Sequence, residues 1–205
     1  MVLLRLVLAT VCLIGAAAPA GAQALDSRVE LGIHGSWLGL ADVGTHPRGL
    51  GSRVSVDLLR WLVLEGEVTA YPKDDVSIDS APGVAPAYRL TYRRSRFEGL
   101  FGARAGVRRG RFGVFAKLRP GFTRLDDGGI TCEGPVCPLI LLAPPAYRTE
   151  LALDAGGVLE FFAAPTAVIR LDVGDTIIRH RSAAPPCAAC TTHNVTTRLG
   201  IGVRF

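Results

Sequence analysis

Residues 194–205 alternate so strictly that they limit what the chain can fold into. Every second residue from Val195 to Phe205 is apolar except Thr197, whereas the residues between them are Thr, Arg or Gly. Strict alternation over this length predicts a β-strand with two different faces. The segment therefore indicates a sheet protein that separates an apolar environment from a polar or crowded one.

Seven earlier segments repeat this pattern. We expect strands at residues 28–40, 51–59, 62–71, 95–107, 111–124, 147–161, 166–179 and 194–205. Short turns are expected near Arg60, Arg108 and Ala164, and longer loops at 41–50, 72–94, 125–146 and 180–193. Pro120 predicts a bulge late in its strand. An even strand count with alternating short and long connections is typical of outer-membrane barrels. The chain is therefore predicted to be all-β, an eight-stranded antiparallel up-and-down transmembrane β-barrel.

The first residues have the form of an export signal. Arg5 precedes an apolar run over residues 6–18, and Ala22-Gln23-Ala24 is a small-x-small cleavage site. We expect a signal peptide at 1–24 and a barrel domain at 25–205. No later run is apolar over about 20 residues, as a membrane helix requires. The net charge of +5 is spread along the chain, which argues against a nucleic-acid partner.

Two features predict that the apolar face points outward, toward lipid. First, glycines collect on the charged face, and the lumen of an eight-stranded barrel is scarcely wider than its side chains; they are Gly32, Gly102, Gly106, Gly113, Gly121, Gly156, Gly174, Gly200 and Gly202. Second, aromatic residues of the apolar face lie near strand ends, as in the two girdles of a membrane barrel. These are Trp37, Phe97 and Phe122 toward the loops, and Phe112, Phe161 and Phe205 toward the turns.

The inward face then carries both charge signs in nearly equal numbers. Unpaired charge in a narrow, partly dry lumen is costly, so we expect ion pairs between strands. The expected network consists of Glu65, Glu67, Glu98, Arg104, Lys117, Arg119, Glu150, Asp154, Arg170, Asp172 and Arg198. Further inward charges are Glu30, Arg53, Asp57, Glu160 and Arg204. Such a network plugs the barrel and argues against an open pore from one copy of the chain.

The exported amino-terminus, the two-faced strands, the strand with residues 170–175 (RLDVGD) and the final Phe205 resemble the outer-membrane-protein β-barrel domain family. That family includes small barrels similar to the membrane domain of OmpA and to OmpX. The resemblance implies a bacterial outer-membrane location, contact with outer-membrane lipid and lipopolysaccharide, and a monomer. It also implies that the closing strand, with Phe205 as the assembly signal, is read by the barrel assembly machinery. A cell-wall tether is not implied, because no peptidoglycan-binding domain follows.

Four cysteines of the expected mature chain lie in two of the long loops. Cys132 and Cys137 share one, and Cys187 and Cys190 share the other. Export to an oxidising compartment makes them disulfide candidates, and a bridge within each loop is favoured because short loops close at low entropic cost. The alternative is a zinc site formed by His180, Cys187, Cys190 and His193. An exported CxxC is more often oxidised than metal-bound, so we expect no metal and no cofactor.

Three further groups are candidates for chemistry. His34 and Ser36 could belong to a lipid-modifying enzyme of deacylase type, but both lie on the predicted lumen face, away from lipid. Asp172 and Glu160 could be paired carboxylates, although nearby Arg170 and Arg198 favour salt bridges. The aromatic and basic run 88–94 could contact lipopolysaccharide phosphates, or simply extend a strand above the membrane with solvated charges.

The favoured hypothesis is a non-enzymatic outer-membrane barrel with a structural or surface-interaction role. The alternatives are a lipid-modifying barrel enzyme, a narrow pore, and a secreted lipocalin-like carrier with the two faces reversed. The sequence indicates no ligand or transported solute.

Overall fold

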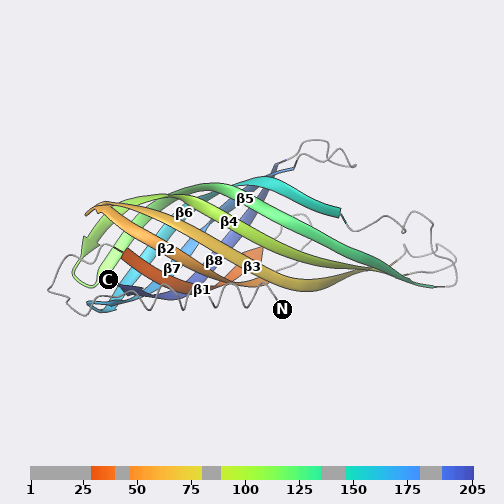
Figure 1. Cartoon of the computed structure of the whole chain (residues 1–205), viewed down its shortest axis with the longest axis horizontal. Coiled ribbons are helices and arrows are strands. Elements are labelled where there is room, and N and C mark those ends of the chain that lie inside the picture. The colour runs from red at the N-terminus through yellow and green to blue at the C-terminus, as the bar shows by residue number, and fades with distance from the viewer. Residues whose placement is uncertain (1–28, 40–46, 80–88, 135–145, 181–190) are drawn as a thin grey trace.

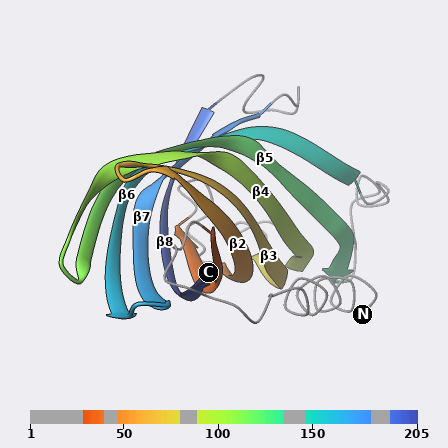
Figure 2. The same cartoon turned by 60° about the vertical axis from the view of Figure 1, so that its left-hand side comes forward.

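The computed structural model describes residues 29–39, 47–79, 89–134, 146–180 and 191–205. They form eight antiparallel strands, each hydrogen-bonded to its sequence neighbours, and the last pairs with the first to close a barrel (Figure 1, Figure 2). The strands are β1 (Val29–Gly39), β2 (Arg48–Leu59), β3 (Leu62–Asp79), β4 (Arg89–Arg109), β5 (Phe112–Glu133), β6 (Ala146–Ala164), β7 (Ala167–Arg179) and β8 (Thr191–Arg204). The predicted fold is confirmed. The predicted signal peptide, 1–24, lies outside the described residues.

The ring closes with a stagger. Starting at Gly32 of β1 and moving from each residue to its partner on the next strand, one reaches Thr192 of β8. Gly32 itself pairs with Gly202 of β8, so this path returns ten residues away from its start. Such a stagger tilts the strands against the barrel axis. As a result, side chains far apart in the sequence meet across the lumen at one level.

Several strands are longer than expected: β2 begins at Arg48 and β8 at Thr191, inside the expected loops 41–50 and 180–193, and β3, β4 and β5 are extended much further. β3, β4 and β5 continue past the other strands at one end of the barrel (Figure 1). The prediction of loops throughout 72–94 and 125–146 was therefore wrong, because β3 runs to Asp79, β4 begins at Arg89 and β5 ends at Glu133. Polar residues can form such strands, since backbone pairing supplies their hydrogen bonds. The register along this extension shifts at Tyr71/Asp74 and at Tyr92/Arg93.

The predicted bulge at Pro120 was also wrong. Leu100 pairs with Gly121 on one side of Pro120, and Ala103 pairs with Leu118 on the other, so the register between β4 and β5 is unchanged. Toward β6, Pro120 itself pairs with Leu153 without a shift. The ring nitrogen only removes one donor from the ladder.

The apolar face points outward along all eight strands. In the described segments the burial pattern alternates, and the outward set includes Ile33, Val114, Leu159, Leu199 and Ile201, each between 49 and 59% exposed. No helix among these residues is long and apolar enough to cross a membrane. The girdle pairs lie in contact: Phe97 and Phe122 with ring centroids 6.2 Å apart, and Phe112 and Phe161 at 5.3 Å. The outward face is thus an apolar band with aromatic pairs near both ends.

Glycines on the inner face permit close approach of the strands. A Cβ placed on Gly106 would lie 2.0 Å from the carbonyl oxygen of Val114, and one on Gly121 would lie 2.0 Å from that of Gly99. Side chains at these positions would collide with the neighbouring backbone. At the β4–β5 turn, Gly110 has a positive φ of 60°, which glycine adopts without steric cost.

Candidate functional site: the charged lumen

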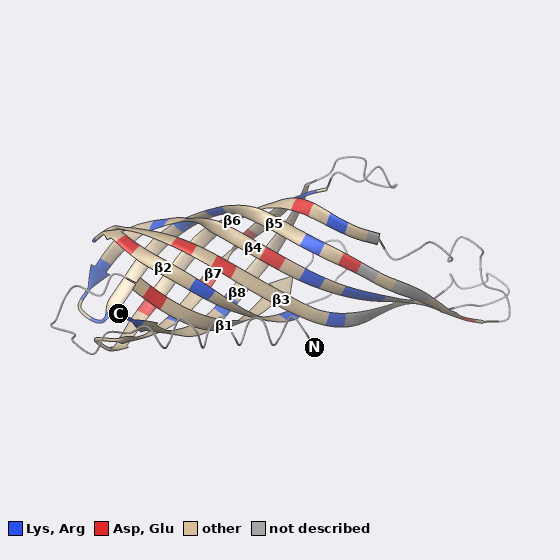
Figure 3. Cartoon of the chain, viewed as in Figure 1, with Lys and Arg blue, Asp and Glu red and all other residues tan. Residues whose placement is uncertain are grey.

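Charged residues recur along most of the strands (Figure 3), and the side chains of many of them are buried in the lumen. Every residue of the predicted network is buried there, none more than 4% exposed. The set extends over β3 to β8, so that no single pair of neighbouring strands holds it. The inward side chains thus fill the barrel from wall to wall.

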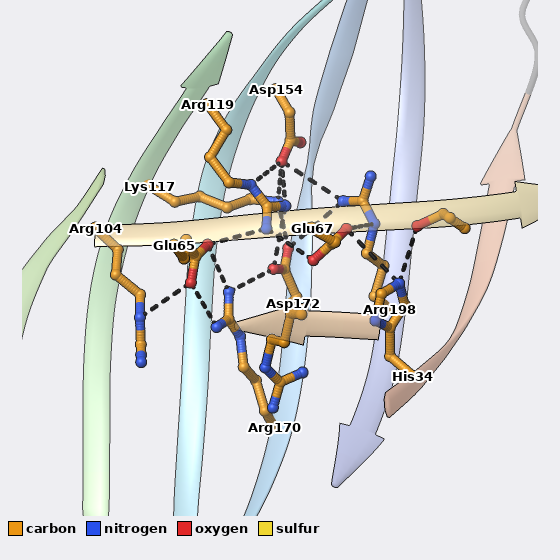
Figure 4. Close-up of polar contacts among 12 residues, drawn as sticks. His34, Glu65, Glu67, Arg104, Lys117, Arg119, Asp154, Arg170, Asp172 and Arg198 are labelled. Atoms are coloured by element: carbon orange, nitrogen blue, oxygen red, sulfur yellow. Dashed lines mark hydrogen bonds and ion pairs between the residues drawn. The ribbon is translucent and has the colours of Figure 1, made fainter. Parts of the chain in front are cut away.

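Arg119 on β5 lies at the centre of this network (Figure 4). Its Nη1 donates to Glu65 Oε1 and to Glu67 Oε2, both at 2.9 Å, and both carboxylates lie on β3. Its Nε donates to Asp154 Oδ2 on β6 at 2.9 Å. Arg119 is completely buried, so these carboxylates replace the water its guanidinium would otherwise bind. One side chain thus holds three strands together.

Arg170 on β7 connects across the lumen to β3. Its Nη1 lies 2.7 Å from Glu65 Oε2 and its Nη2 lies 2.9 Å from Glu65 Oε1, a two-point contact. Its Nη2 also donates to Asp172 Oδ2 at 3.0 Å. Lys117 of β5 donates to Asp154 Oδ2 at 2.6 Å and also pairs with Asp172. Charge-assisted contacts with planar fork geometry are among the strongest in proteins.

Arg198 of β8 completes the central layer. Its Nε lies 2.8 Å from Glu67 Oε1, and its Nη2 donates to Glu98 Oε1 at 2.6 Å. Arg104 of β4 pairs with Glu160 and lies 3.2 Å from Glu65 Oε2. Each cation of this central layer contacts at least two carboxylates, so the carboxylates are shared among cations rather than divided into isolated pairs.

The turn-side end of the lumen contains a residue that was predicted only as part of a turn. Arg108 donates to both oxygens of Asp57, at 2.6 and 3.0 Å, and Arg204 donates to Asp57 Oδ2 at 2.5 Å. Arg108 also lies over the ring of Phe115, and Arg108 and Arg204 over that of Phe162, at 5.1 to 5.7 Å. Arg108 continues the inward alternation of Arg104 and Gly106, and that spacing would have identified it.

Two apolar clusters interrupt the charged lumen. Val63, Phe115 and Val158 form one near the turns, and Leu100, Ala152 and Ile178 form another farther from them. All six are at most 5% exposed. The alternation in the sequence predicts a polar or small inner face, and these positions depart from it. Between apolar layers the ion pairs are screened less by water, which strengthens each contact.

The structure places His34 and Ser36 in the lumen, as expected. His34 Nε2 lies 3.0 Å from Thr69 Oγ1, and Ser36 Oγ lies 2.9 Å from the hydroxyl of Tyr71. Both residues are at most 3% exposed. Their side chains therefore face polar groups of β3 and have no access to lipid. This arrangement gives no support to catalysis by this pair.

The cysteine predictions fall mainly on residues that are not described. Cys132, in the last part of β5, is disulfide-bonded. Cys137, Cys187 and Cys190 lie outside the described residues, so the predicted pairing stays a prediction. Within the described ranges, no group of three or more His, Cys, Asp or Glu side chains is arranged to hold a metal ion.

The basic run at 88–94 belongs to β4 from Arg89 onward, so these residues do extend a strand. Ser77 and Thr91 contact each other through their hydroxyls at 3.1 Å, and Thr131 Oγ1 donates to the carbonyl of Thr91 at 3.4 Å. The three strands of the extension are therefore joined by side chains as well as by their ladders.

Comparison with known proteins gives likeness in structure only. No protein-family model and no curated protein matches the chain. Among solved structures, a major outer membrane protein from Thermus thermophilus is similar with a TM-score of 0.50 at 12% identity, covering 86% of this chain and 99% of that one. OprG of Pseudomonas aeruginosa (TM-score 0.48, 11% identity, 88% and 97% covered) and Ail of Yersinia pestis (0.47, 13%, 87% and 97%) have the same kind of similarity. The chain therefore has the fold of bacterial outer-membrane β-barrels.

Proposed function

We propose that this protein is an integral outer-membrane barrel with a structural or surface-interaction role, whose lumen is plugged by ion pairs. The observation that carries the proposal is the network around Arg119, in which side chains from opposite walls meet in the middle. A lumen crossed by fixed charge pairs leaves no continuous water column for a solute. The same network stabilises the barrel from inside, because each pair links strands that are distant in the sequence.

The turn-side end supports the sealed lumen. Asp57 forms ion pairs with Arg108 and Arg204, and both guanidinium groups lie over the ring of Phe162. These residues come from four strands and form a floor below the central layer. Any ion entering from that side would meet paired charges and aromatic rings before it reached Arg104. The inward glycines also help to seal the lumen, because they allow neighbouring strands to approach closely and so narrow it.

The outward band supports insertion in a membrane. Large apolar side chains along every strand are 36 to 76% exposed. Soluble monomers rarely expose a continuous apolar surface of this extent. We infer an outer-membrane location and contact with outer-membrane lipid. A monomer is inferred because the ring closes with eight strands from one chain. Recognition of the closing strand by the barrel assembly machinery, with Phe205 as the signal, stays a prediction.

The extension of β3, β4 and β5 supports the surface role. It carries Arg89 and Arg93, whose side chains are exposed, and just below it, where β5 still pairs with β6, exposed Arg124 stacks on Tyr147 at 5.0 Å. Cations and aromatic residues just beyond the apolar band lie where lipid phosphates gather. We infer that this rim contacts the phosphates of lipopolysaccharide. Specificity for other surface partners would reside on the same projecting sheet.

Planar-bilayer recording of the refolded full-length protein tests the plug. The protein should show heat-modifiable migration on gels, as a closed barrel does, and no stable conductance steps. The double variant Arg119→Ala/Arg198→Ala should raise ion flux, because it removes two cations of the central layer. The double variant Arg60→Ala/Arg111→Ala changes two exposed cations beside the short turns and should leave the recordings unchanged. Large, stable steps from the unmodified protein would overturn the sealed lumen.

A further inference from the structure

A polar His–Asp pair interrupts the apolar outer face where β7 meets β8. Asp175 points outward between Val173 and Ile177, and His193 points outward two residues from Val195. His193 Nδ1 lies 2.6 Å from Asp175 Oδ2, and the two side chains are 66 and 39% exposed. Unlike the charges of the lumen, this pair faces the surroundings of the barrel.

The carboxylate of Asp175 is held on both oxygens. Its Oδ1 accepts the backbone N–H of Asn194 at 2.9 Å, while its Oδ2 accepts the proton of His193 Nδ1. A carboxylate only accepts, so Nδ1 is the protonated nitrogen and the neutral ring keeps a lone pair on Nε2. A carboxylate that fixes one ring nitrogen while the other stays available is the base–orienter half of a hydrolytic site.

The pair lies near the loop-side edge of the apolar band. His193 pairs with Ile177, and Val195, two residues nearer the turns, pairs with Gly39 at the end of β1. A lipid-facing charge is costly at the bilayer midplane and costs little near the interface. The pair is therefore tolerated at the level where the hydrocarbon region ends. Acyl ester groups of lipids occupy that same level.

A cation lies beside the pair on the same face. Arg179 pairs with Thr191 across the β7–β8 ladder, so it is a diagonal neighbour of His193. Diagonal neighbours in an antiparallel pair are within reach of long side chains. Arg179 is exposed, as is Thr191. A guanidinium there is suited to stabilise negative charge that develops on an ester oxygen, or to hold a lipid phosphate.

We propose that His193, oriented by Asp175, is a general base that hydrolyses acyl esters of lipids in the outer leaflet. The inference rests on the membrane location proposed above and places the lipid-modifying alternative on residues other than His34 and Ser36. His193 Nε2 takes a proton from water, and the water oxygen attacks the ester carbonyl carbon. The bond from that carbon to the alkoxide oxygen then breaks, and the imidazolium returns the proton to the alkoxide. The products are a fatty acid and an alcohol, and water is the only co-reactant.

A structural role alone explains this pair less well. An exposed His–Asp contact contributes little to folding, and an apolar pair at these positions would suit the lipid face. By contrast, the fixed carboxylate and the neighbouring cation both have a use in ester hydrolysis. Asp175 is a positioning residue in this scheme, because it contacts His193 and the backbone and would not touch the substrate.

Fatty-acid release by the refolded full-length protein tests the proposal. One arm uses phosphatidylethanolamine vesicles and the other uses vesicles containing lipopolysaccharide, with both products scored by mass spectrometry. Release above protein-free vesicles in either arm is expected, and the arm that responds identifies the lipid class. His193→Gln should lower release by about 10²-fold or more, the usual contribution of a general base. Asp175→Asn should lower kcat by a similar factor with KM unchanged, which loss of a structural contact alone would not do.

His180→Gln is the matched control. His180 directly follows β7, and its Nε2 lies 3.0 Å from Thr192 Oγ1. It is therefore close to the His193–Asp175 pair in the chain but not part of it. It should retain full release. All variants are first checked for heat-modifiable migration, so that a failure to fold is separated from a failure of catalysis. No release from a correctly folded barrel in either arm, or release that persists in His193→Gln, would overturn the proposal and leave the membrane barrel itself intact.

Discussion

Arg170 and Glu65 form a two-point ion pair across the barrel, with N–O distances of 2.7 and 2.9 Å. Arg170 belongs to β7 and Glu65 to β3, which lie four strands apart in either direction around the ring. The two side chains therefore extend from opposite walls and meet in the lumen. A contact of this kind prevents the barrel from flattening, because it fixes the distance between walls that share no backbone hydrogen bond.

Removing one partner of this pair should destabilise the barrel. Arg170→Ala leaves Glu65 buried with Arg119 and Arg104 as its remaining cations. Breaking a buried pair lowers the free energy of unfolding by about 3–5 kcal/mol. Because two cations still contact Glu65, the loss for this variant should lie near the lower value of that range. Urea unfolding in lipid vesicles, followed by tryptophan fluorescence, measures the loss in free energy of unfolding.

The double variant Arg170→Ala/Glu65→Ala supplies the test of coupling. Its loss should be smaller than the sum of the two single losses, since no unpaired carboxylate is left behind. Arg60→Ala, at an exposed turn, should stay within about 0.5 kcal/mol of the unmodified protein. Strictly additive losses would show that the two residues do not interact in the folded barrel.

Close strand approach at Gly121 gives a second prediction. A Cβ there would lie 2.0 Å from the carbonyl of Gly99 and 2.9 Å from the Cα of Leu100, both backbone atoms that cannot rotate away. Gly121→Ala should therefore cost about 1–3 kcal/mol or more by overpacking. The fraction of heat-modifiable protein after refolding should fall accordingly.

Gly157 provides the matched control on the outward face. Its nearest neighbour to an added Cβ is the carbonyl of Phe115 at 3.9 Å, an ordinary contact. Gly157→Ala should refold as well as the unmodified protein, or gain about 0.5–1 kcal/mol because alanine loses less chain entropy on folding. Equal refolding yields for the two alanine variants would contradict the assigned inner and outer faces.

Alternation in the sequence was sufficient for the strand count, the closure and the side of each charge in the predicted network, because a period of two decides which face a residue occupies. It could not decide which charges meet. Arg170 reaches Glu65 only because the ring closes with its particular stagger, and no local pattern encodes that stagger. The pairings of Arg119 across β3 and β6 depend on it in the same way.

Other misses have local causes. The sequence predicts a loop for the upper part of β3, because Pro72, Asp74 and Asp75 lower strand propensity, yet pairing with β4 overrides that preference. The pattern does not predict Phe115 and Leu100 in the lumen, because a bulky apolar residue on a charged face breaks the simple alternation. Asp175 was assigned to neither face, because a charge between Val173 and Ile177 breaks the apolar pattern, and only the structure places it outward beside a histidine.

The cysteines give a third prediction. Cys132 is disulfide-bonded, and the favoured pairing is with Cys137, five residues later along the chain, with Cys187 bridged to Cys190. Short loops close at low entropic cost, and an exported protein meets an oxidising compartment. Non-reducing peptide mapping of protein isolated from membranes should find both local bridges. Peptides that join the two loops would contradict this pairing.

The outward band gives the last prediction, which separates a membrane barrel from a soluble one with reversed faces. Leu199 lies in the middle of β8 and is 49% exposed, and Leu59 lies at the short turn between β2 and β3 and is 50% exposed. In water the two positions would tolerate lysine equally, because their exposure is the same. In a bilayer Leu199→Lys faces hydrocarbon and should cost about 2–4 kcal/mol, whereas Leu59→Lys at the interface should cost about 0–1 kcal/mol. Urea unfolding from lipid vesicles measures both, and equal losses would place the band in water.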